Sequence, residues 1–213
     1  MPCTGQIRPV FYFPRNAGLS FNNRAARNWF RKSYTIEMFF KMRELNSWKR
    51  VVDYKARQSD NGCYVFNGQL QFYPRATSDT IPFTVNRYSY YVVTRDSATQ
   101  IVKIYSSGRA RISFVDNSED GVLSDSGKLN FFHDDLRIQN EASAGSVALI
   151  RLYQRALDSL TIQSQFTNIC NTLSVGDQSP PPLQLRLHPN SRRCLNGYYS
   201  IKSYWPTISN FIS

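Results

Sequence analysis

The sequence predicts an all-β fold, an antiparallel β-sandwich of the jelly-roll type, over residues 1–172 of a chain of 213. Three observations lead to this prediction. Aromatic residues make up 14% of the chain and are mostly Tyr and Phe, which suit pleated strands. From Ser33 onwards, the hydrophobic pattern repeats every second residue. Turn residues separate the short strands, and helices do not intervene until the end.

The first strand, over residues 18–23, is expected at the edge of a sheet. A loop or single helical turn follows it over residues 24–32. The run YTIEMFFKM then alternates as a half-buried strand does, with Tyr34 and Ile36 on one face and Thr35 and Glu37 on the other. The same reasoning predicts strands over residues 18–23, 33–42, 49–55, 62–66, 69–74, 88–96, 100–106, 109–116, 128–135 and 146–153.

Turn chemistry fixes two hairpins. Asn67-Gly68 lies between alternating runs, and a type I′ turn needs positive φ at both of these positions. Ser107-Gly108 is expected to turn the chain in a similar way. The exception to the strand pattern is a helical segment over residues 156–165, which we expect to be a short turn that closes the sandwich. Residues 173–213 contain three consecutive prolines and read as a linker and a loosely ordered tail.

The chain is basic, with 26 Lys and Arg against 15 Asp and Glu and a formal net charge of +11. A polyanion, including nucleic acid, is therefore one candidate partner. Two groups of basic residues could contact phosphates, the first with Trp29 and Phe30 interleaved for stacking: Arg24, Arg27, Arg31 and Lys32, and Arg43, Lys49 and Arg50. The basic residues are nevertheless scattered along the chain, which favours a solvated surface over a nucleic-acid site.

Four cysteines are too few for a disulfide scaffold, and no pair has the spacing of a zinc or redox site. Cys63 reads as a small buried hydrophobe, and Cys170 and Cys194 could be bridged in an oxidising compartment. Cys3 has no assigned role. No apolar run is long enough for a membrane span, and no signal peptide is recognisable.

Catalytic patterns are absent from the sequence. Glycoside hydrolysis needs two carboxylates on either side of the bond, and the strands offer single acids. Asp134 and Asp135 are adjacent and would point to opposite faces of a strand. The two histidines, His133 and His188, form no triad pattern, and no phosphate-binding loop occurs. We therefore expect a non-enzymatic protein, with a polysaccharide hydrolase as the alternative.

Several segments resemble the laminin-G-like, concanavalin A-type jelly-roll domains of secreted and cell-surface proteins, many of them bacterial. They are YTIEMFFKMRELNSWKRVVDYKARQSDNGCYVFNGQLQFYP, YVVTRDSATQIVKIYSSGRARISFVD, LNFFHDD and EASAGSVALIRLYQRAL. The resemblance runs from about Val10 to about Phe166. It implies an extracellular or cell-surface module that binds a glycan or an extracellular protein through loops at the rim of the sandwich. The same fold also hosts glucanases, which is why the hydrolase alternative stays open.

The candidate site residues follow from these expectations. Glycan binding needs aromatic platforms beside polar groups, and the candidates are Trp48, Tyr54, Tyr64, Tyr73 and Tyr105, with Asp53 nearby. Trp48 ranks first, because it lies beside Lys49 and Arg50 at the junction of a loop and a strand. Laminin-G-like domains often hold calcium at the sheet rim, so the resemblance also implies a calcium site. Its expected ligands are Asp116 in the acidic loop, Asp134 and Asp135. A solvated acidic loop is the alternative interpretation of these residues.

Overall fold

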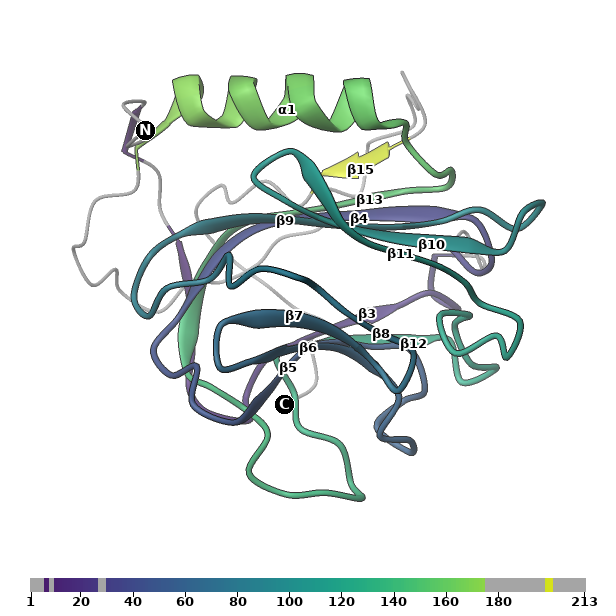
Figure 1. Cartoon of the computed structure of the whole chain (residues 1–213). Coiled ribbons are helices and arrows are strands. Elements are labelled where there is room, and N and C mark those ends of the chain that lie inside the picture. The colour runs from purple at the N-terminus through teal and green to yellow at the C-terminus, as the bar shows by residue number, and fades with distance from the viewer. Residues whose placement is uncertain (1–5, 8–9, 27–29, 175–197, 201–213) are drawn as a thin grey trace.

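The computed structural model describes residues 6–7, 10–26, 30–174 and 198–200. Two antiparallel sheets pack face to face, and a single helix lies across the outer face of the larger sheet (Figure 1). The predicted all-β antiparallel sandwich is therefore confirmed. Its core lies between the sheets and includes side chains from both of them, among them Ile36, Val51, Leu70, Val93 and Ile104.

The larger sheet has seven strands, and its central members are long and buried. In spatial order the strands are β11 (Arg109–Val115), β10 (Ile101–Ser106), β9 (Ser89–Arg95), β4 (Tyr34–Met42), β13 (Gly145–Tyr153) and β15 (Tyr198–Ser200), and β2 (Phe11–Phe13) also pairs with β13. Hairpin β10–β11 turns at Ser107 and Gly108, both with positive φ, as the turn chemistry predicts.

The smaller sheet has six strands: β3 (Leu19–Asn22), β12 (Lys128–Phe131), β5 (Trp48–Asp53), β6 (Gly62–Phe66), β7 (Gln69–Tyr73) and β8 (Ala76–Thr77). Hairpin β6–β7 has φ values of 50° at Asn67 and 85° at Gly68, which confirms the expected type I′ turn. A separate short pair joins β1 (Gln6–Ile7) to β14 (Leu173–Ser174) in parallel.

The helix differs from the prediction of a short turn over residues 156–165. Helix α1 (Ser159–Thr172) begins three residues later than expected and is 14 residues long. Its start is fixed by Asp158, whose Oδ1 accepts a hydrogen bond of 2.8 Å from the backbone nitrogen of Thr161. Ile162 and Ile169 bury its inner side against the outer face of the larger sheet, so the central strands of that sheet are covered on both faces.

The glycine that begins β13 has a steric reason. A Cβ atom on Gly145 would lie 2.3 Å from the carbonyl oxygen of Lys41 and 2.5 Å from the ring of Phe13. Gly145 pairs with both β2 and β4 at this point, so only a glycine lets the three strands meet.

Strand β12 ends earlier than predicted. It stops at Phe131, because Phe132 adopts a left-handed φ of 60° and redirects the chain. Asp134 and Asp135 therefore lie in the connection to β13, which extends below the six-stranded sheet (Figure 1).

Part of the predicted tail joins the fold, because Tyr198–Ser200 pair with Arg151–Tyr153 as strand β15. Leu173 and Ser174 of that tail form β14, and residues 175–197 and 201–213, including His188 and Cys194, lie outside the described residues, as does any bridge between Cys170 and Cys194. Within the described part of the chain, no helix has the length and apolar character needed to cross a bilayer.

Candidate functional site

The outward face of the six-stranded sheet carries a row of polar and aromatic side chains. In hairpin β6–β7, Val65 and Leu70 point into the core, so the alternation directs Tyr64 and Gln71 outward. Strand pairing places Arg50 of β5 beside Tyr64, and Trp48 lies two residues before Arg50 on the same face. Tyr73 lies two residues after Gln71. Side chains from β5, β6 and β7 thus share one surface.

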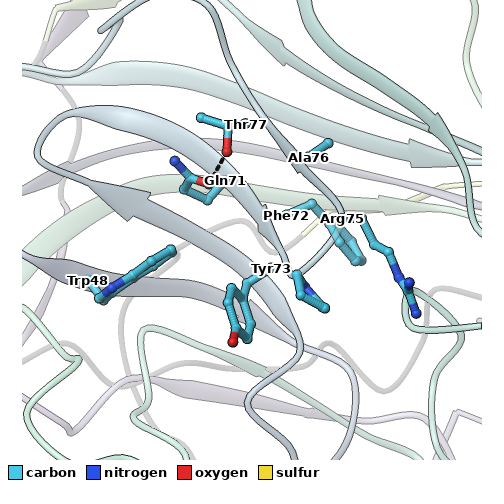
Figure 2. A pocket seen from close by; sticks show the side chains of 8 residues that line it. Trp48, Gln71, Phe72, Tyr73, Arg75, Ala76 and Thr77 are labelled. Atoms are coloured by element: carbon cyan, nitrogen blue, oxygen red, sulfur yellow. Dashed lines mark hydrogen bonds between the residues drawn. The ribbon is translucent and has the colours of Figure 1, made fainter.

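One end of this surface is hollowed into a pocket of about 360 Å³. Its lining residues come from β5 and from the β7–β8 hairpin: Trp48, Gln71, Phe72, Tyr73, Pro74, Arg75, Ala76 and Thr77. The rings of Trp48 and Tyr73 meet edge to face, with centroids 5.5 Å apart, and Figure 2 shows them beneath Gln71. The pocket therefore combines two aromatic rings with amide and hydroxyl groups, while the Arg75 side chain turns away from the rings toward Asp120 (Figure 2).

Neighbouring contacts hold the Trp48 ring in place. Its centroid lies 4.6 Å from that of Phe66 and 5.5 Å from that of Tyr64. The Thr77 hydroxyl donates a hydrogen bond to Oε1 of Gln71, drawn as a dashed line in Figure 2. Aromatic faces backed by fixed polar groups are the features that carbohydrate sites use, because a sugar ring presents both C–H and hydroxyl groups.

The structure places Trp48, the first-ranked candidate, in contact with the rings of Tyr64 and Tyr73. Three other predicted ligand contacts are instead buried. Tyr54 lies in the core near Tyr34 and Phe72, because its side chain points to the inward face. Asp53 is buried and accepts hydrogen bonds from Asn130 and from the backbone nitrogens of Lys55 and Arg57, so it fixes the turn after β5.

Tyr105 is the third buried candidate. It lies on the outer face of the larger sheet, where α1 covers it, and its hydroxyl is 3.2 Å from Oγ of Ser159. The sequence named Tyr105 as a candidate platform, and alternation alone does not indicate that a helix covers this face of the sheet.

A second polar cluster lies next to the pocket and is centred on the buried guanidinium of Arg50. Its Nη2 atom donates to Oδ2 of Asp135 and lies 3.4 Å from Oδ1 of Asp60. Its Cζ atom lies 4.3 Å from the ring centre of Tyr64, whose hydroxyl donates to Asp60 at 2.7 Å. Tyr64 therefore contacts both the Arg50 cluster and the Trp48 ring of the pocket.

Three carboxylates meet in this cluster. Oxygen atoms of Asp60, Asp135 and Glu141 all lie within 4.8 Å of one another. Burial raises the pKa of Glu141 to about 7, and the negative charges of Asp60 and Asp135 add to this shift. Burial and the neighbouring Asp135 also raise the pKa of Asp60. The cluster thus carries more negative charge than Arg50 neutralises.

The three predicted calcium ligands do not come together. Asp116 is buried elsewhere, where its Oδ2 accepts a hydrogen bond of 2.8 Å from Nε of Arg95 and its carboxylate caps the turn at Asp120 and Gly121. Asp135 belongs to the Arg50 cluster. Asp134 lies beside it and accepts a hydrogen bond of 3.1 Å from the backbone nitrogen of Glu141. Asp116 lies apart from Asp134 and Asp135 because its carboxylate forms a buried ion pair with Arg95.

The predicted basic groups are largely engaged. Arg50 and Lys49 are buried, Arg31 pairs with Asp125, and Lys32 pairs with Glu119. Arg24 donates to the carbonyl oxygen of Asp125. Arg43 lies over the ring of Tyr12, and Arg27 lies outside the described residues. In the described part of the chain, these residues do not form the contiguous stripe that the nucleic-acid interpretation requires.

Sequence reasoning missed Gln71, Arg75, Asp60 and Glu141 as site residues. For Gln71 a signal existed, because the two-residue turn at Asn67-Gly68 sets the register that places it beside Tyr64. Nothing in the sequence indicates that Asp60 and Glu141, 81 positions apart, lie together.

Solved structures with the same fold include carbohydrate-binding proteins. The CBM40 domain of the Ruminococcus gnavus IT-sialidase, bound to α2,3-sialyllactose, aligns with a TM-score of 0.58 at 10% identity over 75% of this chain and 97% of that one. The Trypanosoma rangeli sialidase in complex with sialic acid aligns with a TM-score of 0.55 at 14% identity, over 78% of this chain and 29% of that one.

A third structure is that of botulinum neurotoxin type C, whose uptake into cells depends on interaction with two ganglioside molecules. It aligns with a TM-score of 0.51 at 14% identity, over 79% of this chain and 45% of that one. At these identities the likeness concerns the fold. No curated protein sequence matches significantly.

The sequence itself matches a family model. The match spans residues 15–163, which include every strand from β3 to β13, the lining of the Trp48–Tyr73 pocket and the Arg50 cluster. The chain therefore belongs to the laminin-G-type branch of the concanavalin A-like lectin/glucanases superfamily.

Proposed function

We propose that this protein is a non-catalytic carbohydrate-binding module and that the Trp48–Tyr73 pocket is its binding site. The pocket geometry carries the proposal: two aromatic rings lie 5.5 Å apart beside the polar groups of Gln71 and Thr77. A sugar ring would stack on an aromatic face while its hydroxyl groups pair with the polar side chains. Sialyllactose and gangliosides, named for the structural neighbours, are the first ligands to try.

A glycan array with the full-length chain tests this proposal. We expect Tyr73→Ala to lower binding at least tenfold, because it removes one wall of the pocket. Tyr12→Ala is the matched control, since Tyr12 and Tyr73 are 40% and 38% exposed and Tyr12 lies on β2, away from the pocket. Trp48→Ala should abolish binding. An array without signal, with the protein folded by circular dichroism, would overturn the proposal and favour a protein-binding module.

We further propose that calcium assists binding and that its ligands are Asp60, Asp135 and Glu141. The support is the convergence of their oxygen atoms within 4.8 Å. In addition, Oε2 of Glu141 and Oδ1 of Asp134 are buried without a hydrogen-bond partner among the described residues. Oxygen ligands of this kind suit calcium, and a bound cation would offset the excess negative charge beside Tyr64.

Calcium binding is measured by thermal unfolding with calcium and with chelator. Calcium should raise the unfolding temperature of the wild type and leave that of Asp60→Asn and Glu141→Gln unchanged. Asp125→Asn is the control, because Asp125 is exposed and distant from the cluster. Equal calcium effects in all of these proteins would show that the cluster is not the site.

A hydrolase is the second candidate, and one observation favours it: carboxylates do converge at Asp60, Asp135 and Glu141. Against it, Asp135 is paired with Arg50, both Asp135 and Glu141 are buried, and no carboxylate lines the pocket. We expect no release of reducing ends from polysaccharides. Activity that Glu141→Gln abolishes would overturn the non-catalytic proposal.

We place the module outside the cell or at the cell surface. The support is the family to which the chain belongs together with the carbohydrate-binding structures that share its fold. Detection of the protein only in the cell interior, after fractionation with a specific antibody, would contradict this placement.

A further inference from the structure

The connection from β12 to β13 presents a pair of exposed aliphatic side chains. Leu136 and Ile138 are 60% and 48% exposed, and they lie closer together in sequence than any other two large exposed hydrophobic residues of the described chain. Exposed aliphatic residues that are scattered singly need no explanation, whereas a pair on one turn calls for one. The five consecutive residues 136–140 are all exposed, and we call this stretch the loop tip.

Hydrogen bonds anchor both ends of this connection on β5. The backbone nitrogen of Phe132 donates to the carbonyl oxygen of Val51 at 3.2 Å, and that of Arg50 donates to the carbonyl oxygen of Glu141 at 2.7 Å. The connection between these anchors extends beyond the six-stranded sheet (Figure 1). The loop tip lies midway between the two anchors and therefore projects from the outward side of that sheet.

The backbone of the loop tip is held in a defined turn. Oδ1 of Asp135 accepts hydrogen bonds from the backbone nitrogens of Arg137 and Ile138, at 2.5 and 2.7 Å. The backbone nitrogen of Leu136 donates to the carbonyl oxygen of Arg57 at 2.9 Å. Because these bonds order the turn in the free protein, contact with a partner costs little further conformational entropy.

The exposed surface of the loop tip carries positive charge and no negative charge. Arg137 lies between the two aliphatic residues, and its Nε atom donates to the carbonyl oxygen of Gln58 at 3.1 Å. The acids of the same connection, Asp134, Asp135 and Glu141, are all buried. The loop tip therefore offers a partner two aliphatic side chains with a guanidinium between them.

This combination fits a lipid surface better than a protein. A stable protein interface buries about 800 Å² on each partner around an apolar centre, but Arg137, Gln139 and Asn140 surround the pair with polar groups. A projecting turn can enter the interface of a bilayer, where aliphatic side chains reach the acyl boundary and an arginine stays at the level of the phosphates. An anionic surface also attracts a protein with a net charge of +11.

We propose that the loop tip docks the protein on an anionic phospholipid surface, with Leu136 and Ile138 inserted and Arg137 at the phosphates. This contact is additional to the proposed carbohydrate binding, because it uses no residue that lines the Trp48–Tyr73 pocket. The pocket also lies on the outward face of the six-stranded sheet, so docking brings it toward the membrane.

Vesicle sedimentation with the full-length chain tests this inference. The vesicles contain phosphatidylcholine alone or with about 30% phosphatidylserine, which gives them a negative surface potential. They carry no glycolipid, and chelator is present, so neither sugar binding nor a calcium bridge contributes. We expect the partition coefficient to be about tenfold or more higher for the anionic vesicles, because the basic protein is attracted to them.

Two substitutions measure the apolar contribution. Leu136→Ser and Ile138→Ser should each lower the partition coefficient on anionic vesicles about tenfold, because half of an aliphatic side chain is worth about this factor on transfer from water. Leu160→Ser is the matched control, since Leu160 is 79% exposed and lies on α1, which covers the larger sheet. It should leave the partition coefficient unchanged.

The charge at the loop tip is tested in the same assay. Arg137→Gln should lower the partition coefficient about fivefold on anionic vesicles and leave that on neutral vesicles unchanged. Arg109→Gln is the control, because Arg109 is an exposed arginine on β11 of the larger sheet. Its effect on anionic vesicles should be smaller than that of Arg137→Gln, because Arg109 is not at the loop tip.

A tryptophan reporter measures insertion directly. We expect brominated lipid to quench the added fluorescence of Leu136→Trp and to leave that of Leu160→Trp unquenched, each relative to the wild type. A side chain that serves only the fold gives no such quenching.

Three results would overturn the inference. If the double variant Leu136→Ser with Ile138→Ser binds anionic vesicles as the wild type does, the loop tip is not the contact. If neutral and anionic vesicles bind equally, the assignment of an anionic surface is wrong. If the folded protein binds no vesicle, membrane docking is excluded and the exposed pair is assigned to a protein partner. The glycan array tests the proposed function separately from all three.

Discussion

Arg50 shows how one residue organises the polar face of the six-stranded sheet. Its guanidinium is fully buried and contacts Asp135, Asp60 and the carbonyl oxygen of Asn61, the last at 3.0 Å. Buried charges of this kind need partners, because an unpaired one loses its hydration without compensation. The position of Tyr64, and through it that of Trp48, depends on these contacts.

Removal of Arg50 should therefore be costly. We expect Arg50→Gln to lower the free energy of unfolding by about 3–5 kcal/mol, because it leaves Asp135 buried without its partner. The double variant Arg50→Gln with Asp135→Asn should lose less than the sum of the single effects. Denaturant unfolding measures these differences. Arg15→Gln, which breaks the exposed pair with Glu44, should change stability by less than about 1 kcal/mol.

Glu141 predicts a pH dependence for the protein in chelator. Burial beside Asp60 and Asp135 raises its pKa to about 7 from an ordinary value of 4.5, so the folded state binds the proton more tightly than the unfolded state does. The free energy of unfolding should therefore fall between about pH 4.5 and pH 7 and level off above. The full shift corresponds to about 3 kcal/mol, and solvent screening at the sheet surface reduces the expected fall to about 2 kcal/mol. Glu141→Gln should remove this part of the slope. An identical pH profile in both proteins would contradict the shifted pKa.

At the scale of the element, α1 covers the outer face of the larger sheet. Its buried side chains meet Phe39, Tyr90 and Tyr105. Beneath it, the buried Glu37 accepts hydrogen bonds of 2.9 Å from each of the hydroxyls of Tyr90 and Tyr153. The central strands, whose alternating sequence predicts burial on one face, are therefore buried on both faces.

The contribution of α1 is measurable with two substitutions on one helix. Ile162→Ala should lower the free energy of unfolding by about 2–4 kcal/mol, because Ile162 is fully buried against the sheet and the change leaves a cavity. Leu160→Ala is the matched control, with a side chain that is 79% exposed, and should change stability by about 0.5 kcal/mol or less. Equal effects would show that the helix does not depend on packing against the sheet.

At the scale of the whole molecule, the basic residues that give the net charge of +11 are spread along the chain instead of gathered in one group. Several of the basic residues that could form a phosphate-binding group are buried or paired with acids, including Arg31, Lys32 and Lys49. The charge therefore assists long-range attraction and does not build a nucleic-acid site in the described residues.

The salt dependence of ligand affinity distinguishes long-range attraction from a nucleic-acid site. A glycan held by a single partly exposed charge pair should lose less than about tenfold in affinity between 50 and 500 mM salt. A protein that contacts six or more phosphates would lose about 10³-fold or more in a smaller range. Fluorescence titration of an acidic glycan and of duplex DNA over this range checks the prediction, and a steep loss with DNA binding would favour the polyanion alternative.

The sequence by itself determined the two-sheet architecture. Side-chain alternation and turn residues are local properties, and the strands from β3 to β13 express them within a few residues, except the two-residue strand β8, which the sequence pattern did not predict. The turn at Asn67-Gly68 also set the register of β6 and β7, and with it the shared face of Tyr64, Gln71 and Tyr73. Trp48 ranks first for a different local reason, because it lies beside Lys49 and Arg50 at the junction of a loop and a strand.

Only the tertiary structure decided which polar residues meet. Asp60 and Glu141 come together because β12 ends at Phe131 and the following loop returns over the sheet. Asp116 lies apart from Asp135 because it pairs with the buried Arg95. Tyr54 and Tyr105 are hidden by the facing sheet and by α1. Burial and charge pairing depend on contacts between segments far apart in the chain, and a local sequence pattern does not indicate which segments will meet.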